Sequence, residues 1–189
     1  MAIPLIVKPI KGVHIDLIAQ SKNGSGKTGA FCIGSVLRVD PKIAKPQVLC
    51  ICHVRELSSQ TAQVYERITK HTNITVTNYT TSGKSEGAMI VVTTLGKLNN
   101  ALKGRKPTFD LSEVKCVVID EADIFFKETR NLQALTEVIT KHFSKLSQKL
   151  QYILFSATYS DEIKKDISTF IAHAQQISIK KEHLQLEHI

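Results

Sequence analysis

The sequence predicts an α/β fold with a doubly wound, mostly parallel sheet flanked by helices on both faces. Short apolar runs alternate with longer amphipathic stretches, and several runs are continuous and β-branched, as in Val117-Val118-Ile119. Strands that are buried on both faces of a parallel sheet have this composition, and helices supply the connections between them. We expect strands at 13–19, 47–52, 74–79, 89–93, 114–120, 151–156 and 175–179.

The stretches between these runs have helical periodicity. In 131–146, apolar residues recur at positions 132, 135, 138, 139, 143 and 146, close to the 3.6-residue repeat of a helix face. We expect helices at 28–39, 55–70, 95–102, 131–146 and 161–172.

Length and composition indicate one globular domain. The chain has 189 residues, of which 42% are hydrophobic, which suits a single core and excludes a disordered chain. We assign residues 1–179 to the domain and the polar residues 180–189 to the start of a linker. The longest apolar runs are far shorter than the ~20 residues that span a bilayer, so we expect no membrane partner.

Charge and cysteine content indicate which ligands and which compartment suit the chain. The chain carries 25 Lys and Arg against 17 Asp and Glu, and the net charge of +8 favours polyanions such as nucleic acid. A solubilising surface coat is the alternative. The four cysteines form no C-x-x-C pair, and no signal-peptide pattern is present. We therefore expect reduced thiols in an intracellular protein, cytoplasmic and/or nuclear.

The first chemical signal is the segment 19–28, Ala-Gln-Ser-Lys-Asn-Gly-Ser-Gly-Lys-Thr, between an expected strand and an expected helix. Gly24 and Gly26 let backbone amides approach a phosphate, and the helix start adds free N–H donors. Lys27 would lie against the β and γ phosphates, and the Thr28 hydroxyl would bind Mg²⁺. A helix-capping turn is the alternative. The predicted nucleotide-binding residues are Ser21, Lys22, Asn23, Gly24, Ser25, Gly26, Lys27 and Thr28.

Two further strand ends carry polar residues. Asp120-Glu121-Ala122-Asp123 follows the run at 114–119, at the sheet edge where α/β proteins bind ligands. Asp120 would bind Mg²⁺ through water, and Glu121 would orient or deprotonate an attacking water. The hydroxyls of Ser156-Ala157-Thr158, after the run at 151–155, could bond the Asp123 carboxylate. Acidic helix starts and hydroxyl helix caps are the alternatives.

Together these elements resemble the first RecA-like domain of a DEAD-box RNA helicase, most closely the mRNA-export subgroup. Residues 19–28 are similar to that family's motif I (A-x-x-G-x-G-K-T), residues 120–123 match motif II letter for letter, and residues 156–158 match motif III. The resemblance implies a RecA-like ATP-binding lobe that uses ATP and Mg²⁺. It also implies catalytic roles for Glu121, Lys27 and Asp120, and interdomain coupling by Asp123, Ser156, Ala157 and Thr158.

The resemblance extends to weaker motifs that touch RNA. Residues 55–57 (Arg-Glu-Leu) resemble the end of motif Ia, with His53-Val54 in place of Pro-Thr, and residues 94–97 (Thr-Leu-Gly-Lys) resemble motif Ib. Gly83 stands near the family's double-glycine turn. Backbone contacts of this kind read no sequence, so little sequence preference is expected. Solvated charges are the alternative for Arg55 and Lys97. The implied RNA-contacting residues are Arg55, Gly83, Thr94, Gly96 and Lys97.

The resemblance also implies parts that this chain does not match. No H-R-x-G-R-x-x-R run of a second RecA-like domain is present, and the adenine-reading Gln would precede Ile3-Pro4-Leu5. An arginine finger from such a second domain is worth about 10³–10⁵ in rate. We therefore expect the full protein to be an ATP-dependent RNA helicase that locally unwinds or remodels RNA and RNA–protein complexes. The 189-residue chain alone should be nearly inactive.

The expected partners are RNA, a second RecA-like domain in cis and regulatory proteins. One alternative is an RNA- or protein-binding module without ATPase activity. Another is a different P-loop enzyme, such as a small-molecule kinase or a GTPase. The chain contains no N-K-x-D guanine motif and only five arginines for a kinase lid.

Overall fold

The computed structural model describes residues 2–22, 24–103, 109–171 and 173–178. Seven strands in this part of the chain form one sheet in the order β3-β4-β2-β5-β6-β1-β7, and every described strand pairing is parallel. The strands are β1 (Leu17–Gln20), β2 (Val48–Cys52), β3 (Val76–Asn78), β4 (Ile90–Thr94), β5 (Cys116–Ile119), β6 (Gln151–Ser156) and β7 (Gln175–Ser178).

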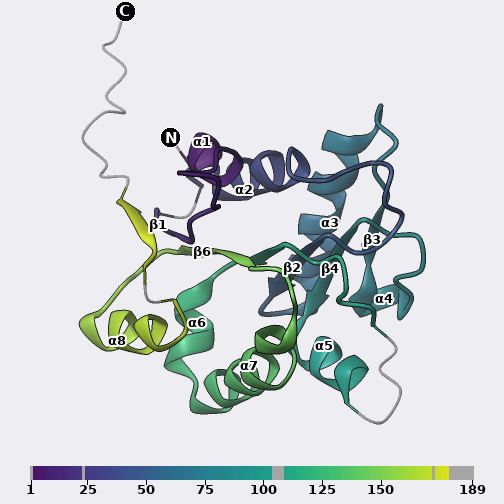
Figure 1. The fold of residues 1–189 in the computed structure, drawn as a ribbon. Helices are drawn as coiled ribbons and strands as arrows, with labels where there is room; N and C mark the ends of the chain where they lie inside the picture. The colour runs from purple at the N-terminus through teal and green to yellow at the C-terminus, as the bar shows by residue number, and fades with distance from the viewer. Residues whose placement is uncertain (1, 23, 104–108, 172, 179–189) are drawn as a thin grey trace, which may run out of the picture.

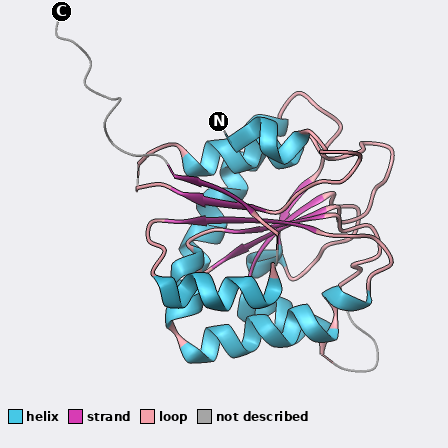
Figure 2. Ribbon diagram, turned by 60° about the vertical axis from the view of Figure 1, so that its left-hand side comes forward, coloured by secondary structure: helices cyan, strands magenta, loops and turns pink. Residues whose placement is uncertain are grey.

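Helices cover both faces of the sheet (Figures 1 and 2). On one face lie α1 (Ala2–Val7), α2 (Lys27–Val36) and α3 (Arg55–Thr69), whose buried side chains form one hydrophobic cluster. On the other lie α5 (Leu95–Leu102), α6 (Ala122–Lys127), α7 (Thr129–Lys141) and α8 (Asp161–Phe170), which form a second cluster with the opposite side chains of the strands. Two short helices, α4 (Tyr79–Ser82) and the 3-10 helix η1 (Phe143–Lys145), complete the described elements.

The two clusters explain the apolar runs in the sequence. Alternate residues of one strand face opposite layers, so Leu49 and Ile51 belong to one cluster and Cys50 and Cys52 to the other. The central strands β2 and β5 are buried at every residue. This burial on both faces confirms the predicted doubly wound α/β architecture.

Several predicted boundaries were wrong. The strand expected at 13–19 begins only at Leu17, because Ile10 and Val13 pair with each other across a tight turn. The helix expected at 131–146 begins at Thr129, ends at Lys141 and is followed by η1. The short helices α1, α4 and α6 were not predicted. By contrast, β6 has the predicted bounds.

The cysteines behave as expected for reduced thiols. Cys32, Cys50, Cys52 and Cys116 are all free and buried. Burial raises the pKa of the Cys32 thiol and of the Cys116 thiol, so both are held protonated. Among the described residues, no helix has the combined length and apolar character that a membrane span requires. Residues 180–189, expected to form a linker, lie outside the described residues.

Candidate nucleotide-binding site

Three neighbouring strands end at the segments that the sequence singled out. In the sheet, β6 lies between β5 and β1, so the loop after β1, the acidic residues after β5 and the hydroxyl residues after β6 meet at one edge. The backbone N–H of Ser21 donates to the carbonyl oxygen of Ser156 at 3.0 Å and ties the loop to the end of β6. Parallel strands present their carboxyl ends together, which is where α/β folds bind ligands.

The loop after β1 carries two glycines in a left-handed backbone conformation. Gly24 and Gly26 have φ angles of 76° and 82°, in the left-handed region that disfavours side chains. Gly26 caps α2 without a side-chain hydrogen bond, and the first amides of a helix have no carbonyl partner within the helix. The Lys27 ammonium donates to the Ser21 carbonyl oxygen at 3.1 Å, which holds it over the loop. These groups together favour an anion at the helix start.

The acidic strand end presents two carboxylates in different surroundings. Burial raises the pKa of Asp120 to about 6, although the Glu121 backbone N–H donates to its Oδ1 at 3.0 Å. Lys27 acts in the opposite direction and lowers that pKa. Glu121 is half-buried and adopts a left-handed conformation, with φ of 53°, where β5 turns into α6.

One open cleft joins the loop and the acidic residues. Gly24, Gly26, Lys27 and Thr28 line it from the loop side, and Asp120 and Glu121 line it from the end of β5. Leu57 and Gln60 of α3 complete the lining and were not predicted as site residues. Their place depends on β2 lying next to β5, and no sequence signal gives that order. Ammonium, amide, hydroxyl and carboxylate groups at one helix start can bind a polyphosphate with a cation.

Other predicted loop residues lie outside this lining. The Ser21 side chain is buried and bonds to the hydroxyl of the exposed Ser25, so this bond links two residues of the loop. Lys22 is exposed and does not line the cleft, and Asn23 lies outside the described residues.

The Asp123 carboxylate is bound by groups from the end of β6 and from its own helix. The Thr158 hydroxyl donates to its Oδ2 at 2.7 Å, and the Lys127 ammonium lies 3.5 Å from the same oxygen. Burial raises the pKa of Asp123, but the hydrogen bond from Thr158 and the charge of Lys127 outweigh it and hold the pKa below its usual value. The expected bond between a hydroxyl of residues 156–158 and Asp123 is present.

The residues assigned to RNA contact lie at the same sheet edge but beside a different group of strands. Arg55 begins α3 after β2, and Thr94, Gly96 and Lys97 span the end of β4 and the first turn of α5. Gly83 caps α4 after β3 with a left-handed φ of 64°. Because β3, β4 and β2 are neighbours, the three segments adjoin one another. Arg55, Gly83, Gly96 and Lys97 are exposed.

The cleft fits a magnesium ion that arrives with phosphate. Thr28 and Asp120 both line it, and both provide oxygen ligands. Among the described residues, no three His, Cys, Asp or Glu side chains gather as a metal site made only by protein would need. Mg²⁺ is commonly bound by one or two protein oxygens plus substrate phosphates and waters, so Thr28 and Asp120 suit it.

The fold and cleft define a P-loop nucleotide-binding domain with a RecA-like arrangement of strands. The chain belongs to the DEAD/DEAH box helicase family, whose pattern matches residues 1–166. It corresponds to the N-terminal RecA-like domain of DEAD-box RNA helicases.

Named relatives agree with this assignment. The chain is 33% identical over 199 residues to DEAD-box ATP-dependent RNA helicase 38 of Arabidopsis thaliana, covering 100% of this chain and 39% of that protein. It is 32% identical over 193 residues to the ATP-dependent RNA helicase DBP5 of Lodderomyces elongisporus, covering 100% of this chain and 36% of that protein. The chain thus spans somewhat more than a third of the length of these relatives.

Solved structures show the same fold. Dbp5 of S. cerevisiae bound to RNA and ADP BeF3 superposes with a TM-score of 0.80 at 30% identity, over 95% of this chain and 44% of that one. A DEAD box protein from Methanococcus jannaschii has a TM-score of 0.75 at 24% identity over 88% of this chain and 46% of that one, which supports the fold alone.

Proposed function

We propose that this chain is the ATP-binding lobe of an ATP-dependent RNA helicase that locally unwinds or remodels RNA and RNA–protein complexes. The observation that carries the proposal is the single cleft lined by Lys27, Thr28, Asp120 and Glu121. A loop with left-handed glycines opens onto this cleft at a helix start, as phosphate binding requires. The names of the matched relatives, which are ATP-dependent RNA helicases, support the same reading.

Each group of residues in the cleft would have its own role in phosphoryl transfer. The loop amides and the Lys27 ammonium bind the β and γ phosphates. Thr28 and Asp120 hold Mg²⁺, with Asp120 acting through water; the bound ion would neutralise phosphate charge. Glu121, at the mouth of the same cleft, orients the attacking water at its carboxylate oxygens and accepts its proton.

Two groups of residues beside the cleft would bind RNA and couple RNA binding to closure of the cleft. Arg55, Gly83, Thr94, Gly96 and Lys97 bind the RNA backbone along the ends of β2, β3 and β4. Asp123, with Ser156, Ala157 and Thr158, transmits closure of the cleft to that RNA surface. If so, Ser156→Ala with Thr158→Ala, in a protein that joins this lobe to a second RecA-like domain, uncouples unwinding from ATP hydrolysis. Equal loss of both activities would contradict this role.

The names of the relatives also bear on the subfamily, location and partners of the whole protein. The recurrence of DBP5 among the matched relatives supports the mRNA-export subgroup and an intracellular, nuclear or cytoplasmic protein. S. cerevisiae dbp5 has been seen bound to nup159 and gle1, so we include regulatory proteins of this kind among the partners. Residues 1–179 form the lobe, and 180–189 begin the linker to a second RecA-like domain.

Nucleotide binding tests the central proposal. The ammonium of Lys27 is placed to bind phosphate, so Lys27→Ala should weaken binding of a fluorescent ADP analogue with Mg²⁺ by at least about tenfold. Lys42→Ala, an exposed lysine in the turn after α2, is the control and should bind as the wild type does. If Lys27→Ala binds as tightly as the control, the loop is structural and a binding module without ATPase activity becomes the better reading.

Turnover tests the contribution of the second domain. Without an arginine finger, the 189-residue chain should hydrolyse ATP negligibly with or without RNA. RNA-stimulated hydrolysis by the isolated chain at a rate of several per second, ordinary for a complete enzyme, would overturn that expectation.

A further inference from the structure

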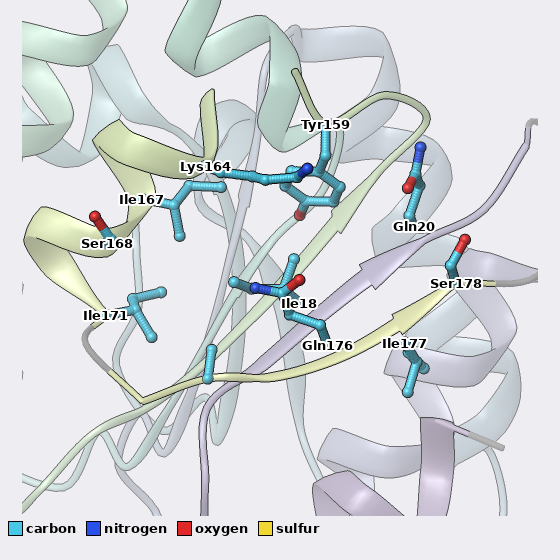
Figure 3. Close-up of a pocket in the computed structure, with 11 residues that line it drawn as sticks. Ile18, Gln20, Tyr159, Lys164, Ile167, Ser168, Ile171, Gln176, Ile177 and Ser178 are labelled. Atoms are coloured by element: carbon cyan, nitrogen blue, oxygen red, sulfur yellow. The ribbon is translucent and has the colours of Figure 1, made fainter. Parts of the chain in front are cut away.

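A second pocket lies between α8 and strands β1 and β7, apart from the nucleotide cleft. Its volume is about 230 Å³, below the usual range of drug-sized sites. Ile18 of β1 lines one side of it, and Ile167 of α8 and Ile171, directly after that helix, line another (Figure 3). All three side chains are buried and belong to the same hydrophobic cluster. These aliphatic walls suit a compact apolar group.

One polar group in this pocket lacks a partner. Among the described residues, the Tyr159 hydroxyl is shielded from solvent and has no hydrogen-bond partner. Figure 3 shows its ring over the pocket, with the hydroxyl end directed toward Ile18. A buried donor without an acceptor costs free energy, so a ligand acceptor at this position would be favoured. Burial raises the pKa of the Tyr159 phenol, and the Asp123 carboxylate raises it further, so the group remains a neutral donor.

The charges around the pocket favour a neutral ligand. Of the described lining residues, only Lys164 carries a charge, and its ammonium already pairs with Asp161 at 2.8 Å. The negative charge of Asp123, which acts on the Tyr159 phenol, would disfavour an anion beside that ring. The other polar lining groups are the amides of Gln20 and Gln176 and the hydroxyls of Ser168 and Ser178.

We propose that this pocket binds a small neutral molecule with a mostly apolar body and one hydrogen-bond acceptor, such as a carbonyl oxygen, that bonds to Tyr159. The volume is too small for a peptide. Gln20 directly precedes the phosphate loop, and Tyr159 directly follows Thr158, so the ligand would lie beside both segments. The site shares no lining residue with the nucleotide cleft.

Isoleucine methyl groups report on the site directly. Cyclohexanone, titrated into the chain labelled with ¹³C at the isoleucine δ1 methyls, should shift the Ile18, Ile167 and Ile171 signals along saturable curves. The methyl of Ile90, in β4, serves as the internal control and should stay fixed. Tyr159→Phe removes only the hydroxyl, so we expect cyclohexanone to bind about three- to tenfold more weakly. Ser168→Trp places a large ring at the exposed rim and should abolish the shifts.

The methyl spectrum also shows whether each variant is folded, independently of nucleotide binding. Shifts that never saturate, or that move Ile90 equally, would overturn the site. Equal affinity in Tyr159→Phe and wild type would overturn the role of the hydroxyl. Undiminished binding in a folded Ser168→Trp variant would place the ligand elsewhere and overturn the proposal.

Discussion

The Thr158 hydroxyl lies 2.7 Å from Oδ2 of Asp123, and this bond joins the end of β6 to the first turn of α6. The Lys127 ammonium contacts both side chains, at 3.2 Å from the Thr158 hydroxyl and 3.5 Å from the Asp123 carboxylate. The carboxylate is therefore satisfied from two elements, and its charge contributes to the stability of their contact.

Removal of this bond should produce a pH-dependent loss of stability. Thr158→Val keeps the shape and removes the donor, so the Asp123 pKa should rise and the free energy of unfolding should fall by about 1–2 kcal/mol at pH 7. A lowered carboxyl pKa stabilises the fold above the unfolded-state pKa, and this stability is lost as pH falls through the folded-state pKa. The difference from wild type should therefore vanish in acid, as measured by urea unfolding across pH.

Thr140→Val is the control for that series. Its hydroxyl donates to the Thr136 carbonyl oxygen and contacts no carboxylate, so any change in stability should not depend on pH. An equal pH dependence in both variants would show that the bond to Asp123 is not its source.

Asp120 should change the free energy of unfolding with pH in the opposite direction. Burial raises its folded-state pKa to about 6, so the folded chain holds this proton more tightly than the unfolded chain. Its protonation stabilises the fold as pH falls below about 6, and the charged form costs stability above that pH. Asp120→Asn should therefore be more stable than wild type at pH 8, by on the order of 2 kcal/mol, and equal to it near pH 3. Urea unfolding at both pH values measures this.

Asp161→Asn provides the contrast. This exposed carboxylate at the start of α8 has a pKa held down by the hydrogen bond and charge of Lys164, so its removal should not stabilise the fold at pH 8. A stability gain in Asp161→Asn as large as that in Asp120→Asn would indicate a general effect of net charge.

The two glycines that flank Lys27 and Thr28 should respond oppositely to the same change. Gly26 has a φ of 82°, so Gly26→Ala should lose roughly 1–2 kcal/mol of stability, although no neighbouring atom would meet the new Cβ. Gly29 lies inside α2 with equally open space, so Gly29→Ala should gain up to about 1 kcal/mol from helix propensity. Urea unfolding of both variants measures these changes. A gain of stability in Gly26→Ala would contradict the left-handed geometry of that residue.

Arg55 should contribute to RNA affinity without regard to sequence. Arg55→Ala should weaken binding of oligouridine and oligoadenine alike, and should lower the slope of log affinity against log salt by about one. Arg67→Ala, in the last turn of the same helix and also exposed, is the control and should change the affinity less. Fluorescence anisotropy at several salt concentrations measures both. Loss confined to one RNA sequence would argue for base contact.

The fold was predictable because its central strands are buried on both faces. The apolar run 152–155 is continuous and bounded by the polar residues Gln151 and Ser156, which are also the limits of β6. The strand predicted to begin at residue 13 begins at Leu17. Val13 pairs with Ile10 in a turn whose apolar side chains are exposed, so the apolar residues before Leu17 do not belong to a strand. The six-residue helix α6 is too short to show a helical period.

Part of the lining of the cleft could be predicted, and part could not. Lys27, Thr28, Asp120 and Glu121 stand in motifs, and local order places each at a strand end. Leu57 and Gln60 enter the cleft only because β2 lies beside β5, a neighbour relation set by tertiary packing. The hydrogen bond between Asp123 and a hydroxyl after β6 was predicted. The ion pair of Asp123 with Lys127 was not, because it depends on the unpredicted helix α6.

The left-handed backbone at Glu121 separates two consecutive acids into unlike environments. At that one residue β5 turns into α6, and Asp120 is buried whereas Glu121 is half-buried in the cleft that both residues line. One unfavourable torsion angle thus lets two consecutive carboxylates enter the same cleft from different surroundings. In the proposed function this is the feature that would let Asp120 serve a cation while Glu121 handles the attacking water.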